Sequence, residues 1–183
     1  MIVESLLNRK YFIRNKTYMY TLWLMPDNAA YQKLSTLIVD LSTTHDTPTF
    51  EPHVTLLSAI TDETSVAIQK TEELANSLIP VSATLTRIDF LEVYYRCLFF
   101  CTNESEDLME ARILAEAIFE HTKINPFIPH VSFLYGSLPI FQKEAIIGEL
   151  GDSFFMDFRM PKLCLVKTQR TPEHWELMAE FEL

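Results

Sequence analysis

The sequence predicts an α+β protein with two pseudo-symmetric lobes, and two observations predict that class. Segments with the period of a strand and segments with the period of a helix alternate along the 183 residues in the order β-α-β-α-β-β-α-β-α-β-β. One short motif occurs twice, at residues 52–56 and 129–133, about half a domain apart. No linker-like composition separates the two halves, so we expect residues 18–183 to form a single two-lobed domain.

The first half begins with a strand. Residues 18–25 are strongly apolar and aromatic, and they end at a proline. Asp27 or Asn28 can cap the next helix, whose apolar residues recur at helical spacing up to the polar stretch 42–49. That stretch predicts a loop leading into the first copy of the motif. A second helix is expected over residues 61–78.

The second half contains the remaining strands and two further helices. Asn103, with Glu106 three residues later, resembles a capping box and so predicts a helix start. The expected elements are, in chain order, paired strands over 81–94 and 96–101, a helix through residue 121, the strand of the second motif, a helix over 141–150, one or two strands within 154–168, and a strand over 175–181.

Composition narrows the class of function. The net charge is −10, and no cluster of lysine and arginine is visible, whereas a protein that grips a long nucleic acid usually has a basic surface. The balance therefore favours a small phosphorylated substrate over a polymer. No apolar run approaches the roughly 20 residues that span a bilayer, so no membrane partner is expected. With only three glycines there is no glycine-rich phosphate loop.

The cysteines indicate a reducing compartment. Cys97, Cys101 and Cys164 are an odd set inside apolar segments and lack the spacing of metal ligands. Reduced, buried thiols in a cytosolic protein are the simplest interpretation. We therefore expect a cytoplasmic protein. We also expect a monomer with no metal or other cofactor.

The repeated motif is the main clue to function. Its copies read Pro52-His53-Val54-Thr55-Leu56 and Pro129-His130-Val131-Ser132-Phe133. A proline can sit at the first residue of a strand, and alternation along the strand then puts the histidine and the hydroxyl on one face. A single copy is usually structural. Two copies bring together two imidazoles and two hydroxyls, which are the groups needed for acid–base work on a phosphate.

These motifs resemble those of the two-histidine (2H) phosphoesterases, and most closely those of the cyclic phosphodiesterases that act on small nucleotides. The resemblance extends from about Met19 to Leu183 and implies two lobes of antiparallel sheet flanked by helices, with the active site in the groove between them. Residues 1–17 have no counterpart and form an N-terminal extension. The segments that carry the resemblance are 20–26, 51–55, 95–99, 126–135 and 166–168.

The resemblance also implies which residues form the site. The implied catalytic residues are His53, Thr55, His130 and Ser132, and the implied aromatic residues around the nucleotide are Trp23, Tyr95 and Tyr135. Periodicity alone would assign each aromatic residue to the core. Strict alternation even places Tyr135 on the face opposite His130, so a role in the site requires an irregularity or a strand end.

Several other residues receive weaker assignments. Lys167 and Thr168 match a family segment near the site, although Lys167 also fits a solvated strand position. The remaining histidines lack a paired motif, so a surface or capping role is expected for His45, His121 and His174.

The expected chemistry is in-line opening of a 2′,3′-cyclic phosphate of a small nucleotide. One imidazole takes a proton from water and the other donates to the leaving oxygen, while Thr55 and Ser132 direct hydroxyls at the non-bridging oxygens. The resemblance suggests His130 as base and His53 as acid, which the residues alone leave open. It also implies a 2′-phosphate product, or the 1″-phosphate from ADP-ribose 1″,2″-cyclic phosphate.

Two alternatives remain open from the sequence. One is a phosphodiesterase acting on RNA 3′ ends, against which the acidic charge argues. The other is a non-catalytic nucleotide-binding module of the same fold. Degeneration of an enzyme would remove a histidine or a hydroxyl first, and all four are present here.

Overall fold

The computed structural model describes residues 19–121, 126–169 and 171–183. The predicted extension over residues 1–17 lies outside the described residues. The elements are β1 Tyr20–Met25, α1 Asn28–His45, β2 Val54–Ile60, α2 Thr64–Ser77, β3 Val81–Asp89, the 3₁₀ turn η1 Tyr94–Arg96, β4 Leu98–Thr102, α3 Glu106–Ile118, β5 His130–Leu134, α4 Ile140–Leu150, β6 Asp157–Met160, β7 Lys162–Lys167, the 3₁₀ turn η2 Pro172–His174 and β8 Glu176–Glu182.

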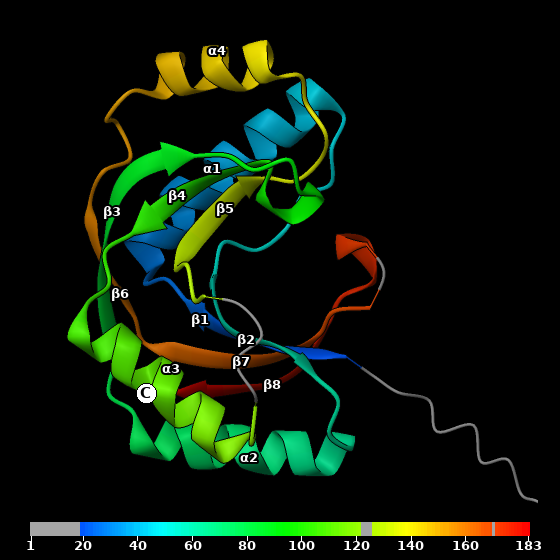
Figure 1. Cartoon of the computed structure of the whole chain (residues 1–183), viewed down its shortest axis with the longest axis vertical. Helices are drawn as coiled ribbons and strands as arrows, with labels where there is room; N and C mark the ends of the chain where they lie inside the picture. Colours follow the sequence, from blue (N-terminus) through cyan, green and yellow to red (C-terminus); the bar gives the residue numbers. More distant parts are fainter. Residues whose placement is uncertain (1–18, 122–125, 170) are drawn as a thin grey trace, which may run out of the picture.

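The described strands form one antiparallel sheet of eight strands, in the order β6-β3-β4-β5-β2-β1-β7-β8. The sheet curls into an open arc (Figure 1). The two motif strands, β5 and β2, are neighbours in its middle. We call β6, β3, β4 and β5 the β5 half, and β2, β1, β7 and β8 the β2 half. The predicted α+β class with two lobes of antiparallel sheet is confirmed, and the lobes join edge to edge.

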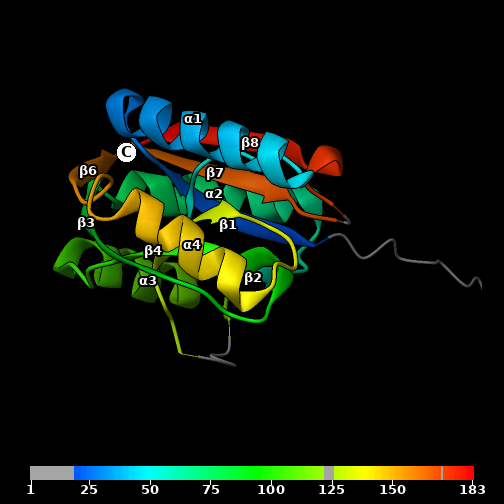
Figure 2. The same cartoon turned by 90° about the horizontal axis from the view of Figure 1, so that it is seen from above.

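Helices cover the outside of the arc (Figures 1 and 2). α1 follows β1 in the β2 half but packs on β5, and α3 follows β4 in the β5 half but packs on β2 and β3. α1 buries a stripe at helical spacing that includes Ala30, Leu34 and Ile38. Each half therefore sends one helix across to the other. This exchange fixes the relation of β2 to β5, which determines how the two motifs face each other.

α1 is longer than predicted. The polar run 42–44 was expected to form a loop, but the hydroxyls of Thr43 and Thr44 donate to carbonyls one turn earlier, at 2.8 Å each. Ser42 is buried, and its hydroxyl donates to the Pro48 carbonyl at 3.1 Å. These hydroxyl bonds, at the exposed Thr43 and Thr44 and at the buried Ser42, accommodate the polar run in the helix, which continues to His45. At the other end Asp27 caps the helix as predicted, accepting from the Ala30 N–H.

The predicted strand over 81–94 is also wrong at its end. β3 stops at Asp89, whose carboxylate accepts the N–H of Phe90 and so favours a turn over a further strand residue. The loop is then closed by a hydrogen bond from the Leu91 N–H to the Arg96 carbonyl, at 2.9 Å. This β3–β4 loop, residues 90–97, contains η1 and therefore Tyr95.

The predicted capping box of α3 is wrong in its first residue. Ser105 caps the helix by accepting from the Leu108 N–H at 3.3 Å. The Asn103 side chain instead accepts from the Thr84 N–H at 2.7 Å, because it lies beside β3. The helix also ends at Ile118, not at residue 121. Predicted helices and strands elsewhere agree with the structure to within three residues at each end. In the described part of the chain no helix is long and apolar enough to cross a membrane.

Candidate active site

The two motifs meet where the halves of the sheet join. β2 and β5 pair antiparallel at Val54 and Val131, near the start of each strand. Both valines are fully buried. Because successive side chains of a strand point to opposite faces, the residues on either side of the two valines share the other face. This register puts His53 beside Ser132 and Thr55 beside His130, so the pleat alone gathers the four predicted residues.

Both imidazoles are held in the same way. The His53 Nδ1 lies 2.6 Å from the Glu51 carbonyl, and the His130 Nδ1 lies 2.7 Å from the Ile128 carbonyl. A carbonyl only accepts, so Nδ1 carries the proton in each ring. The Nε2 atom of each ring is left as an acceptor when the ring is neutral and a donor when it is charged. The proline between carbonyl and histidine holds the extended backbone in both copies.

An aromatic ring supports each histidine from the neighbouring strand. Trp23 pairs with Thr55 across the strands, and its ring stacks on His53 with centroids 3.8 Å apart at 10°. Phe99 pairs with Ser132 and meets the His130 ring edge-on at 5.1 Å. Trp23 was predicted for the site, whereas Phe99 was not, because its segment reads as uniformly apolar core. The pseudo-symmetry therefore extends to the rings that position the imidazoles.

One cavity of about 740 Å³ contains all seven predicted site residues in its wall. Tyr135 reaches it because β5 ends at Leu134, so alternation no longer applies, and Gly136 follows with φ of +143°. Its ring stacks on Phe50 with centroids 3.6 Å apart. Tyr95 comes from η1, lines the cavity and is half exposed. The predicted strand-end position of Tyr135 is thus what the structure shows.

The wall also contains residues that the sequence did not single out. Trp175 lies between η2 and β8 and contacts Trp23 edge-on, with ring centroids 5.4 Å apart. It also lies 6.0 Å from Tyr95 and from Tyr135. In the sequence, Trp175 is only the first residue of the predicted strand over 175–181. No local signal distinguishes it, since its neighbours in the cavity come from distant parts of the chain.

The residues with weaker assignments differ in where the structure places them. Thr168 lines the cavity, and its hydroxyl bonds that of Thr21 at 2.7 Å. Lys167 points elsewhere and pairs with Glu176 on β8 at 2.8 Å. His121, which follows the end of α3 and is half-buried, also lines the cavity, a position that the expected surface or capping role did not include. His45 and His174 are not among the described residues of the wall.

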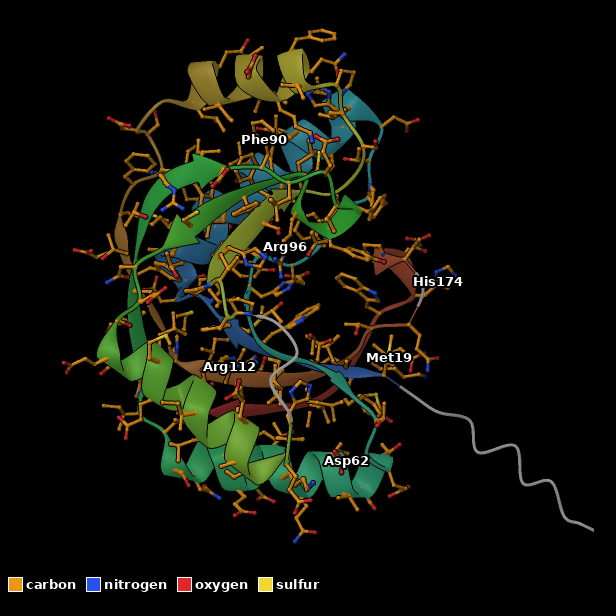
Figure 3. All side chains as sticks on the ribbon, in the orientation of Figure 1. Met19, Asp62, Phe90, Arg96, Arg112 and His174 are labelled. Atoms are coloured by element: carbon orange, nitrogen blue, oxygen red, sulfur yellow. The ribbon has the colours of Figure 1, made fainter. Side chains whose placement is uncertain are left out.

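The charge of the cavity is opposite to that of the protein. Two arginines and three histidines stand among its described lining residues, and no aspartate or glutamate does, in a chain of net charge −10. Arg112 on α3 bonds Glu116 at 2.8 Å and the Leu56 carbonyl, and lies over the Phe127 ring. Figure 3 shows Arg112 toward the lower half of the molecule and Arg96 toward the upper half. A wall of this kind favours an anionic ligand.

Comparison with known proteins agrees with this geometry. The family described as cyclic phosphodiesterase-like protein matches residues 19–183. The chain belongs to that family. It is therefore a phosphodiesterase of the two-histidine superfamily.

Individual relatives cover nearly the whole chain. A cyclic phosphodiesterase of Arabidopsis thaliana is 27% identical over 171 residues, which span 90% of this chain and 94% of the relative. The crystal structure of TT0787 of Thermus thermophilus superposes with a TM-score of 0.59 at 14% identity, covering 91% of this chain and 97% of that one. The crystal structure of Escherichia coli LigT complexed with 3′-AMP superposes with a TM-score of 0.54 at 12% identity, covering 92% of this chain and 99% of that one. These two structures share the fold.

Burial holds both imidazoles of this phosphodiesterase in the neutral form. It lowers the pKa of His53, which is 7% exposed, to about 4, against the opposing hydrogen bond to Glu51. The charge of a protonated His130 acts in the same direction. Burial also lowers the pKa of His130, and the Arg96 guanidinium adds to that effect. In the free protein neither ring is charged at pH 7.

The Ser132 hydroxyl is positioned before any ligand arrives. The Ser132 hydroxyl donates to the Tyr95 carbonyl at 2.9 Å. A phosphate oxygen in the cavity must therefore draw that proton away from the carbonyl. Burial, with the neighbouring Tyr95, raises the pKa of Tyr135, so its phenol stays a neutral donor. Across the described residues no three His, Cys, Asp or Glu side chains gather as metal ligands would.

Proposed function

We propose that the protein hydrolyses 2′,3′-cyclic nucleotides to 2′-phosphates without a metal, and ADP-ribose 1″,2″-cyclic phosphate to the 1″-phosphate. The observation that carries the proposal is the meeting of the two His-x-(Thr/Ser) motifs at the β2–β5 junction, inside a cavity whose described wall contains no carboxylate. The family supports a cyclic phosphodiester as substrate. The cavity volume of about 740 Å³ lies in the range of small-molecule sites.

The reaction uses one histidine on each side of the phosphorus. The neutral imidazole takes a proton from water, whose oxygen forms a bond to phosphorus. The bond from phosphorus to the 3′ oxygen breaks in line with this attack, and the second imidazole gives that oxygen a proton. Thr55 and Ser132 donate to the non-bridging oxygens, on which negative charge accumulates. The base gains one proton and the acid loses one, so the step balances, and proton exchange with solvent restores the starting state of both rings.

Two contacts support the assignment of His53 as acid and His130 as base, against the burial that opposes a charge on His53. The face of Trp23 stacked on His53 stabilises an imidazolium by a cation–π interaction. Arg96 opposes a second positive charge on His130. Because burial keeps both rings neutral in the free protein, the acid must gain its proton with the substrate, whose anionic phosphate favours the charged form.

Hydrolysis of 2′,3′-cyclic AMP in excess EDTA tests the proposal. We expect full activity with the chelator, a loss of about 10²–10⁴-fold in His53→Ala and in His130→Ala, and about 10²-fold in Thr55→Val and Ser132→Ala. His45→Ala, outside the cavity, is the matched control and should keep the wild-type rate. Loss of activity in EDTA, or a double His53→Ala/His130→Ala variant with wild-type rate, contradicts the mechanism.

The orientation of the sugar is tested separately. Phosphorus NMR of the product from 2′,3′-cyclic AMP should show the 2′-phosphate. A main product with the phosphate on the 3′ oxygen means that the ribose is turned over between the histidines. That result would reverse the acid and base assignments and leave the two-histidine chemistry intact.

A further inference from the structure

Arg96 is a cation in the cavity wall without an anionic partner among the described residues. It is the last residue of η1, and it lines the same cavity as His130. No described residue accepts a hydrogen bond from its guanidinium. Arg112, the other arginine of the described wall, already bonds Glu116 and a backbone carbonyl. Since an arginine fork matches a phosphate, the donors of Arg96 remain available for one.

The backbone around Arg96 is held firmly. Its N–H donates to the Val93 carbonyl at 2.9 Å, and its carbonyl accepts the Leu91 N–H at 2.9 Å. From α4, the Lys143 ammonium donates to the Leu91 carbonyl at 3.3 Å and to Glu92 at 2.9 Å. Lys143 is 1% exposed, so its ammonium group is shielded from water, whereas Glu92 is largely exposed. The β3–β4 loop therefore presents the guanidinium with little backbone freedom to lose on binding.

Arg96 stands outside the symmetry of the reaction centre. Each half of the sheet supplies one histidine, one hydroxyl and one aromatic ring to the junction, so the reacting phosphate receives matched contacts from both sides. Arg96 comes from the β5 half alone. It acts on His130 by its charge without a hydrogen bond to it. It therefore lies in the wall of the same cavity but off the junction of the two motifs, where a second group of the substrate would pass.

We propose that Arg96 binds a second phosphate of the substrate, so that the enzyme prefers cyclic phosphates that also carry a 5′-phosphate or an equivalent group. This inference rests on the proposed function. It assigns Arg96 to specificity, while the two motifs perform the reaction.

The test compares kcat/KM for adenosine 2′,3′-cyclic phosphate and for its 5′-phosphorylated form. A charge-assisted hydrogen bond is worth enough for a preference of about 10–100-fold toward the 5′-phosphorylated substrate. Arg96→Gln should bring the ratio close to one, and Arg96→Lys should keep part of it. Arg87→Gln is the matched control, since Arg87 is 67% exposed on β3 and outside the cavity. Its ratio should equal that of the wild type.

Binding of the products separates this inference from the proposed function. Calorimetry with adenosine 2′,5′-bisphosphate and adenosine 2′-phosphate needs no turnover. Tighter binding of the bisphosphate, lost in Arg96→Gln, supports the subsite even if neither substrate is hydrolysed. Hydrolysis of both substrates at equal kcat/KM by the wild type overturns the subsite and leaves the proposed function standing. An equal loss for both substrates in Arg96→Gln also overturns it, because Arg96 then acts on the reacting phosphate.

Discussion

Replacing His53 by glutamine should flatten the pH dependence of stability below pH 6.5. The imidazole is buried under Trp23, and its pKa falls from the usual 6.5 to about 4 in the folded protein. Between these values the unfolded chain binds a proton that the folded chain does not, so stability rises with pH in this window. The contribution of His53 is fully present above about pH 6.5 and is lost as the pH falls toward 4.

The magnitude follows from the two pKa values. The lowered pKa of His53 reduces the free energy of unfolding by on the order of 3 kcal/mol across the whole window, and by on the order of 2 kcal/mol at pH 5. Urea unfolding at pH 5 and pH 7.5, at constant ionic strength, measures it in the wild type and in His53→Gln. The carboxylates titrate alike in both proteins and cancel in the difference. The wild type should lose about 2 kcal/mol more than the variant on acidification.

Two further results complete this test. Between pH 7.5 and 8.5 His53 is neutral in both the folded and the unfolded chain, so the two proteins should show the same pH dependence there. If they also agree within about 0.5 kcal/mol at pH 5, His53 accepts a proton in the folded state near its ordinary pKa. Burial would then not keep His53 uncharged, contrary to the mechanism proposed above.

Three other predictions concern activity. The pH dependence of kcat/KM reports the free enzyme, and its optimum should lie below pH 6.5 because the pKa values of both histidines are lowered. The optimum of kcat should lie at higher pH. An optimum of kcat/KM above pH 7 contradicts the prediction. Trp23→Leu should destabilise the fold by about 2 kcal/mol, measured by urea unfolding. It should also lower kcat about 10-fold in steady-state assays, because it removes the aromatic face that supports a charged His53. An unchanged kcat refutes the cation–π role. Lys143→Met should change the free energy of unfolding by less than about 1 kcal/mol, since the freed Glu92 stays in water. It should nevertheless raise KM about 10-fold, because it loosens the loop that carries Tyr95. Lys143→Arg should recover part of the loss in KM, and an unchanged KM in Lys143→Met excludes the anchoring role.

Local sequence patterns predicted the elements that place the motifs. Strand alternation is a property of the backbone, so the pairing of each histidine with a hydroxyl two residues later was readable without the fold. The cap of Asp27 and the apolar stripe of α1 are local in the same sense. Where local signals competed, prediction failed: Asn103 and Ser105 are both good caps, and only the position of β3 decides that Asn103 bonds a strand instead.

The sequence by itself determined the groups to which we assign the proposed chemistry: two histidines and two hydroxyls in repeated strands, inside an acidic chain without a basic cluster. Tertiary structure alone decided what surrounds that chemistry. Phe99, Trp175 and Arg96 look like a core residue, a strand residue and a loop residue, and they reach the site through strand pairing, through the turn before β8 and through the loop held by Lys143. Such contacts join residues far apart in the chain, and their existence depends on packing across the whole sheet. No local periodicity encodes that packing, so these three residues became visible as neighbours of the two motifs only in the folded molecule.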